Sequence, residues 1–236
     1  MRNLTIPLAM ALTVATGTAN ADALGIYAGG GIWDHDPSGT FGTEGDASIN
    51  AESDLAYSGE SDTYFYAAFE HFVPLVPNVR VEVASMEHTG TAAGLTFNGV
   101  SATGDSSISL DTTDAIAYWR LLDNWINFDF GLNVRQLEAD FVVGPETVSV
   151  SETVPMLYVA AQVDLPFTGF SVGADINTIS VSGVTYQDMR VRALYEMGVI
   201  GLEAGLKSTT IELDDVDNVN ADLEFEGVMF GAFLHF

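Results

Sequence analysis

The C-terminal segment alternates between two sets of side chains, and this alternation limits the possible folds more than any other feature. Counting back from the last residue in steps of two gives Phe236, Leu234, Ala232, Phe230 and Val228, all apolar. Successive side chains of a β-strand point to opposite faces, so a period of two predicts a strand with one apolar face. We therefore expect the chain to end in a strand.

The same period recurs upstream in segments of about ten residues, the length that a tilted strand needs to span a membrane. These segments predict an all-β fold, a transmembrane antiparallel up-and-down β-barrel of about ten strands, whose even number returns both chain ends to one side. A soluble periplasmic β-sandwich is the alternative, because half-buried soluble strands alternate too. The predicted strands are Leu24–Trp33, Asp62–Phe72, Val79–His88, Asp111–Leu121, Ile126–Glu138, Thr153–Leu165, Phe170–Ile179, Tyr186–Glu196, Leu202–Leu213 and Leu223–Phe236.

The lengths of the connections favour one orientation. The second, fourth, sixth and eighth connections are short and most carry turn-forming Pro, Asn, Asp or Gly, as expected of periplasmic turns. The others predict longer acidic extracellular loops, with Val181–Thr185 as a short exception. The long ones are Asp34–Ser61, Thr89–Leu110, Ala139–Glu152 and Asp214–Asp222.

The N-terminus has the pattern of an exported protein. Arg2 precedes an apolar stretch, and Ala19-Asn20-Ala21 supplies a small-x-small cleavage site. We expect a Sec-type signal peptide over residues 1–21, cleaved near Ala21, and one outer-membrane barrel domain over residues 22–236. Phe236 resembles the C-terminal assembly signal of bacterial outer-membrane barrels, so the expected partners include periplasmic chaperones and the barrel-assembly machinery of a Gram-negative cell.

Composition excludes several functions. Without Arg2, six Lys and Arg face 33 Asp and Glu, a formal charge of −27. This charge argues against nucleic acid, whose phosphates need cationic side chains. The chain has no cysteine, which excludes disulfides and thiolate chemistry. No cofactor motif is present.

The six remaining cations all fall on the polar, inward set of the predicted strands, as do many acids. Buried charges are costly unless they are paired, so we predict an ion-pair network that fills most of the lumen. Ten strands enclose far less space than the 16–18 of aqueous porins. A narrow ion path or a small-ligand cavity is the alternative. The predicted network comprises Arg80, Arg120, Arg135, Arg190, Arg192, Lys207, Glu70, Glu82, Asp114, Asp129, Asp164, Asp175, Asp188 and Glu203.

The predicted outer loops are strongly acidic. Residues 34–62 hold eight acids and no Lys or Arg, and four more acids crowd 214–222. We expect a hydrated acidic rim, with divalent cations bridging to lipopolysaccharide as the alternative. Asp215–Asn220 fails as a calcium loop, because Val219 occupies a ligand position and the required glycine is missing.

A hydrolase is the alternative function. Asp34-His35-Asp36 and Glu87-His88 could form an Asp/His water-activating site at the extracellular rim, as in omptin-like outer-membrane proteases. The motifs of that protease family are not recognisable. A lipase would need a serine partner for His71, and none is evident.

Several turns and strands resemble a family of functionally uncharacterised outer-membrane β-barrel proteins of proteobacteria. The resemblance covers nearly the whole mature chain and is carried by Leu24–Asp34, Leu122–Asn127, Pro155–Tyr158, Asp164–Gly169 and Glu212–Val216. It implies an outer-membrane barrel and supplies no catalytic residues. We therefore expect a non-enzymatic integral barrel, structural or narrowly porin-like, monomeric, and in contact with outer-membrane lipid and lipopolysaccharide.

Overall fold

Alternating segments account for almost all regular structure in the computed structural model, which describes residues 24–73 and 75–236. The expected signal peptide, residues 1–21, lies outside the described residues. The strands are β1 (Leu24–Thr43), β2 (Ile49–Asn50), β3 (Glu60–His71), β4 (Asn78–Phe97), β5 (Val100–Asp123), β6 (Ile126–Val143), β7 (Glu146–Asp164), β8 (Phe170–Val181), β9 (Val184–Met197), β10 (Ile200–Val216) and β11 (Val219–His235).

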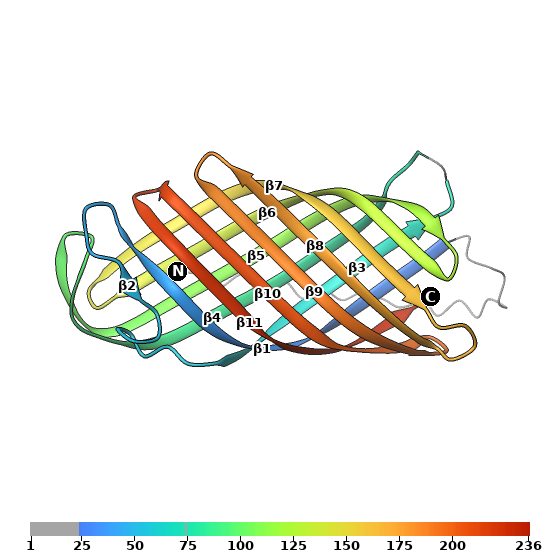
Figure 1. Cartoon of the computed structure of the whole chain (residues 1–236), viewed down its shortest axis with the longest axis horizontal. Helices are drawn as coiled ribbons and strands as arrows, with labels where there is room; N and C mark the ends of the chain where they lie inside the picture. The colour runs from blue at the N-terminus through green and yellow to red at the C-terminus, as the bar shows by residue number, and fades with distance from the viewer. Residues whose placement is uncertain (1–23, 74) are drawn as a thin grey trace, which may run out of the picture.

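These strands form a closed barrel (Figure 1). Each barrel strand pairs antiparallel with its neighbours in the chain, and β11 pairs with β1 to close the ring. The two-residue β2 pairs only with β1, beside the ring. The prediction of an all-β, ten-stranded antiparallel barrel is confirmed.

The described residues include no helix of the length and apolar character needed to cross a membrane.

Both ends of the described barrel meet at one end of the molecule, here named the terminal end. The amide of Ile26 donates to the carbonyl of Phe236 at 3.0 Å, and the reverse bond is 2.9 Å. The turns at this end lie around residues 72–73 and 75–77, 124–125, 165–169 and 198–199. The opposite end, named the far end, carries the other hairpins.

The far-end connections are shorter than predicted. β4 and β5 continue through Thr89–Leu110 and meet at a tight turn at Asn98 and Gly99, both with positive φ, and β6 and β7 likewise continue through Ala139–Glu152. Asn-Gly is the residue pair that such two-residue hairpin turns favour. Only residues 44–59, around β2, form a long connection, so most predicted extracellular loops are strands.

An inversion of polarity within single strands explains this error. On β6 the apolar side chains up to Val134 are exposed on the outside of the barrel, whereas from Leu137 onward they are buried inside. Glu138 and Asp140 then take the outside positions. The apolar residues stand at even-numbered positions up to Val134 and at odd-numbered positions from Leu137 onward. Because the alternation is interrupted there, one continuous strand has the sequence pattern of a strand followed by a polar loop.

Two outer zones follow from the inversion. Near the terminal end the exposed outward side chains are apolar, and we name this zone the apolar belt. Its residues include Ile26, Ile32, Phe65, Phe69, Val79, Val81, Val83, Leu121, Phe130, Leu132, Val134, Leu157, Val159, Val163, Phe170, Val172, Met189, Val191, Leu202, Leu206, Val228 and Phe230. Toward the far end the exposed outward side chains are carboxylates. We name them the acidic collar, and they include Asp34, Asp36, Glu60, Glu87, Asp111, Glu138, Asp140, Glu212, Asp222 and Glu226.

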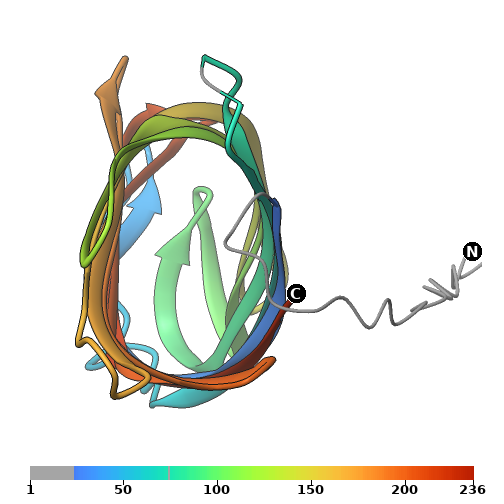
Figure 2. The ribbon, with the colours of Figure 1, turned by 90° about the vertical axis from the view of Figure 1, so that its right-hand side faces the viewer.

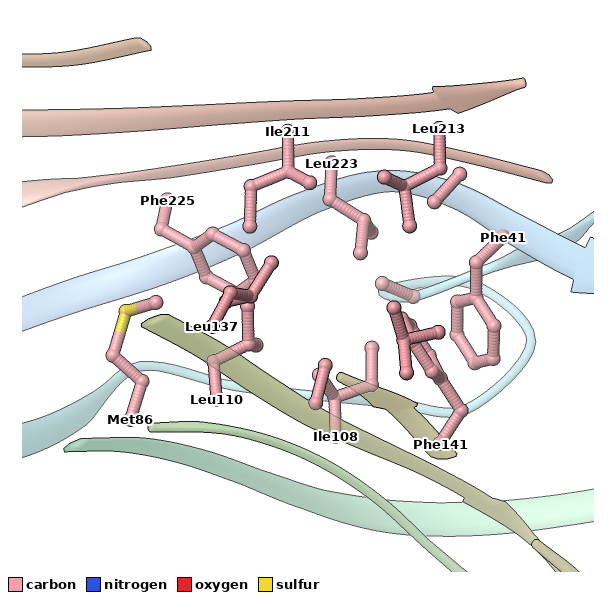
Figure 3. Packing of buried hydrophobic residues seen from close by; sticks show 14 of the residues in the cluster. Phe41, Met86, Ile108, Leu110, Leu137, Phe141, Ile211, Leu213, Leu223 and Phe225 are labelled. Atoms are coloured by element: carbon pink, nitrogen blue, oxygen red, sulfur yellow. The ribbon is translucent and has the colours of Figure 1, made fainter. Parts of the chain in front are cut away.

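The interior inverts in the opposite sense. Inside the acidic collar lies an apolar plug of buried side chains. Figure 3 shows Phe41, Ile108, Leu110, Leu137, Phe141, Ile211, Leu213, Leu223 and Phe225 of this plug. Phe97 belongs to the same cluster. Residues 44–59 add Leu55 and Tyr57 to it.

The tip of the β4–β5 hairpin bends inward over the far mouth, where it is visible as the green hairpin within the ring of strands (Figure 2). A β-bulge between Ala93 and Leu95 produces the bend. The amide of Asn98 donates to Thr43 Oγ1 at 2.8 Å, and the ring of Phe97 packs edge-on against Phe41. The hairpin tip therefore packs against the end of β1 at the far mouth.

Candidate functional site

Inside the apolar belt the lumen is lined by polar and charged side chains from every barrel strand. Strand alternation fixes this arrangement, because the residues between the lipid-facing apolar ones must point inward. All six cations of residues 22–236 point inward, as the sequence predicts.

The central ion pairs cross the lumen. Arg190 Nη1 on β9 lies 2.7 Å from Glu82 Oε1 on β4, a strand on the opposite side of the ring, and Arg190 Nε lies 2.8 Å from Asp175 Oδ2. Glu82 also accepts from Arg80 at 2.8 Å. This ion pair therefore spans the lumen from one wall to the opposite wall.

A second cluster extends this pairing. Arg192 bridges Asp175 at 2.8 Å and Glu203 at 2.9 Å. Glu203 also accepts from the hydroxyl of Tyr64 at 2.7 Å. The Arg80 guanidinium stacks over the ring of Tyr66, 4.2 Å from its centroid. Three arginines and three carboxylates therefore form one connected, charge-balanced group.

Arg135 centres a third cluster, nearer the plug. It binds Asp114 through Nε and Nη2, both at 2.7 Å, and Asp188 at 2.5 Å. Asn133 and Thr209 donate to the same two carboxylates. All three charged side chains of this cluster are more than nine-tenths buried.

Arg120 forms the last cluster, toward the terminal end. It binds Glu70 at 2.6 Å and Asp129 at 3.0 Å. The hydroxyl of Tyr118 donates to Glu70 at 2.6 Å. One guanidinium here serves two carboxylates.

Two residues of the predicted network stand apart from these pairs. Lys207 points inward but lies over the ring of Trp33, with Nζ 4.1 Å from the centroid, and it has no ion pair in residues 24–73 and 75–236. Asp164 accepts from Asn127 at 2.9 Å and from Gln162 at 2.8 Å instead of from a cation. The other twelve predicted residues take part in the ion pairs described above.

The histidines of the hydrolase alternative meet inside the barrel, between the charged lumen and the plug. His88 Nε2 lies 3.1 Å from His35 Nδ1, and His35 Nε2 lies 3.2 Å from Asp62 Oδ2. Asp34 and Asp36 project outward into the acidic collar, so the structure pairs His35 with Asp62 instead of with its chain neighbours. Sequence alone could not show this, because Asp62 belongs to the neighbouring strand.

Hydrogen-bond directions follow from one fixed acceptor. The carbonyl of Ser58 can only accept, so His88 Nδ1 donates to it at 3.0 Å. A neutral His88 then accepts at Nε2 from His35 Nδ1, which leaves His35 Nε2 without a hydrogen opposite Asp62. The contact between His35 Nε2 and Asp62 Oδ2, at 3.2 Å, is accordingly the longest of these three contacts.

Burial keeps this pair neutral. Burial, together with the neighbouring His88 and Lys207, lowers the pKa of His35 to about 4, against the opposing effect of the collar carboxylates Asp34 and Asp36. Burial also lowers the pKa of His88. Both side chains are at most 1% exposed and pack against Phe225. A general base needs access to substrate, and both of these side chains are buried.

The acids of the far end do not converge on a metal-binding geometry. No group of three or more His, Asp or Glu side chains in residues 24–73 and 75–236 is arranged to hold a metal ion. Residues 214–222 comprise the adjoining ends of β10 and β11 and a turn at residues 217–218, and the Asp215 amide donates to Asn220 Oδ1 across it. Phe236, the predicted assembly signal, lies half-exposed at the terminal edge of the apolar belt.

Comparisons with known proteins extend only to the fold. No protein-family model and no curated protein matches the chain. The structure of the outer membrane protease OmpT from Escherichia coli is similar, with a TM-score of 0.56 and 9% identity over 94% of this chain and 100% of OmpT. Ail of Yersinia pestis has a TM-score of 0.43 and 12% identity over 91% of this chain and 100% of Ail. OprG from Pseudomonas aeruginosa has a TM-score of 0.37 and 13% identity over 90% and 95%.

All three are outer-membrane β-barrels. At 9% identity, the similarity to OmpT shows the fold alone: this chain has the antiparallel barrel fold of outer-membrane proteins. No comparison supports the narrower family resemblance of the sequence analysis.

Proposed function

We propose that the protein is an integral outer-membrane barrel that does not catalyse a reaction and does not conduct, with its lumen closed by ion pairs and by the apolar plug. The cross-lumen contact between Arg190 and Glu82 carries this proposal, since it joins opposite walls of the ring at 2.7 Å.

The apolar belt supports the membrane location. Its side chains are large, exposed and arranged around the ring, which would be unfavourable in water and is favourable in lipid. Trp125 and Phe167 lie exposed at turns of the terminal end, a position that aromatic rings favour at membrane interfaces. The terminal end would then face the periplasm, and the acidic collar would stand outside the cell.

Membrane fractionation tests the location. The proposal expects the mature protein in the outer-membrane fraction, extracted only by detergent. Recovery in the soluble periplasmic fraction without detergent would favour the β-sandwich alternative and would contradict the proposal.

The partners of the barrel are proposed on the same basis. Outer-leaflet lipid would contact the apolar belt, and Phe236 would be read by the barrel-assembly machinery after delivery by chaperones. Lipopolysaccharide phosphates would meet the acidic collar, where both charges are negative, so divalent cations in solution would bridge them. Chelation by EDTA should therefore weaken retention of lipopolysaccharide by the purified protein.

An omptin-like hydrolase is the second candidate, supported by the fold similarity to OmpT and by the contact between His35 and Asp62. Burial of both histidines beneath the plug argues against it. Purified protein should leave peptide substrates intact. Cleavage that is lost in His35→Ala but retained in His71→Ala, a histidine near the terminal end, would favour the hydrolase.

A further inference from the structure

The far part of β7 has one side without a neighbouring strand. β7 pairs with β8 only from Leu157 to Asp164, and the β8–β9 hairpin turns soon afterwards, at residues 182–183. From there to Glu146, β7 pairs within the described residues only with β6. In Figure 1 the yellow hairpin of β6 and β7 accordingly extends farther toward the far end than the orange hairpin of β8 and β9. We name residues 147–153 the free edge.

The turn between β6 and β7 decides which backbone groups point along the free edge. Val143 and Glu146 pair across the two residues Gly144 and Pro145, so they form a hydrogen-bonded pair of the ladder. Such pairs alternate along an antiparallel ladder, and the register continues without a shift as far as residue 163. Even-numbered residues of β7 therefore bond to β6, and odd-numbered residues turn their N–H and C=O toward the β8 side.

Hydrogen bonds at the other end of β7 confirm this assignment. The amide of Asp164 donates to the carbonyl of Trp125 at 2.9 Å, on the β6 side, and the amide of Leu165 donates to the carbonyl of Phe170 at 2.8 Å, on the β8 side. Pro155 agrees with it, since a proline has no N–H and is tolerated in a sheet where the edge needs no donor. The backbone groups on the free edge are therefore those of Thr147, Ser149, Ser151 and Thr153.

These backbone groups have no partner in residues 24–73 and 75–236. The other open edge of the far end, on β4, is covered by the chain itself. β3 and β4 pair only as far as Ala84, but beyond it the amide of Glu87 donates to Asp62 at 3.1 Å and the amide of Thr91 donates to the carbonyl of Leu55 at 2.8 Å. A row of unpaired N–H and C=O groups is a template for another strand, and β7 keeps such a row uncovered.

The surroundings of the free edge select the chemistry of that strand. On the outside, Glu138 and Asp140 of β6 lie directly beside the free edge, and every Lys and Arg of the described residues points inward. On the inside, Val148 and Val150 pack into the apolar plug. An added strand would therefore need cationic side chains outward and apolar side chains inward.

We infer that the free edge binds an extended peptide segment outside the cell, as an added antiparallel strand whose Lys or Arg side chains alternate with apolar ones. Main-chain hydrogen bonds would hold the peptide, and the carboxylates of β6 would select its charge. A second copy of this chain does not fit, because two acidic collars repel each other and a two-fold axis along the membrane normal cannot place two tilted β7 strands antiparallel. This inference goes beyond the proposed function, because strand addition at the rim neither catalyses a reaction nor opens the lumen.

Fluorescence anisotropy with the detergent-solubilised mature protein tests the inference. The probe is a labelled peptide of alternating lysine and valine, as long as residues 147–153. An outward lysine lies opposite a residue of the free edge, so its backbone N–H joins the ladder, whereas the valine N–H groups point away. Methylation of the lysine backbone nitrogens should weaken binding about tenfold or more, the effect of several lost hydrogen bonds. Methylation of the valine backbone nitrogens is the matched control and should leave binding unchanged.

A pair of protein variants tests the same edge from the other side. Ser151→Pro removes one N–H of the free edge, and Ser151→Ala keeps it, while both lose the hydrogen bond from Gln136 to the Ser151 hydroxyl. The proline variant should bind the peptide about tenfold more weakly than the alanine variant, because it lacks the donor and its ring blocks the edge. It should fold as the alanine variant does, since no described group accepts from the Ser151 amide. The peptide pair requires no change to the protein, so it decides the question even where Ser151→Pro fails to fold.

Three results would overturn the inference. They are equal binding of the two methylated peptides, equal binding by folded Ser151→Pro and Ser151→Ala, and equal affinity for a peptide with glutamate in place of lysine. A conducting barrel that still binds the peptide would contradict only the proposed function. A barrel that neither conducts nor binds the peptide would contradict only this inference.

Discussion

At the scale of single residues, the stability of a buried charged side chain depends on whether it has an ion-pair partner. Desolvation makes an isolated buried charge costly, and here five arginines and seven carboxylates share that cost through short contacts. Removing one partner of a buried pair should therefore lower the free energy of unfolding by more than the intact pair adds to it.

Arg135 gives the sharpest stability test. Arg135→Met would leave Asp114 and Asp188 buried without a cation, which should lower the free energy of unfolding by about 3–5 kcal/mol. Urea unfolding of the refolded protein in lipid vesicles measures this change. Replacing all three residues with apolar ones of similar volume should restore most of the stability. A single variant as stable as the parent would contradict the buried network.

The histidine pair gives a pH test. Because burial lowers the pKa of His35 to about 4, the unfolded chain binds a proton more readily than the folded one between about pH 6.5 and pH 4. Stability from this group is therefore complete above pH 6.5 and is lost as the pH falls through about 4. NMR titration of labelled histidine should show His35 neutral at pH 6. A midpoint at or above 6.5 would contradict this account.

The sequence predicts which residues face the lumen, because strand parity alone decides that. It does not predict their partners. Arg190 and Glu82 are 108 residues apart and meet only because the ring places β9 opposite β4. The register between neighbouring strands likewise decides two other contacts. It places His35 beside Asp62, and it places Lys207 over the ring of Trp33.

At the scale of the strand, one element crosses two environments. Each long strand is apolar outside and polar inside along the belt, and acidic outside and apolar inside beyond it. The sequence predicts the belt portions well, because apolar and polar residues alternate clearly there. It misses the far portions of β4 to β7, where the change of parity has the appearance of a loop.

Two substitutions on the same face of β6 test the boundary. Leu132→Arg would place a charge in the apolar belt and should lower the free energy of unfolding in vesicles by about 2–4 kcal/mol. Glu138→Arg lies on the same outward face in the acidic collar and should change it little. Equal effects in vesicles would mean that the belt does not contact lipid.

At the scale of the whole molecule, two kinds of contact cross the barrel. Ion pairs cross the lumen inside the belt, and the apolar plug packs inside the collar, with the β4–β5 hairpin bent inward at the far mouth. The number of strands and the closure of the ring follow from the sequence. The plug does not, because its residues lie in segments that have the sequence pattern of loops.

Single-channel recording in planar bilayers tests this closure most directly. The account predicts no discrete conductance steps from the parent protein, whereas a variant with Phe41, Phe97 and Phe141 replaced by alanine, together with Arg190→Ala and Glu82→Ala, should open stable steps. Stable, reproducible steps from the unmodified protein would contradict the closed barrel.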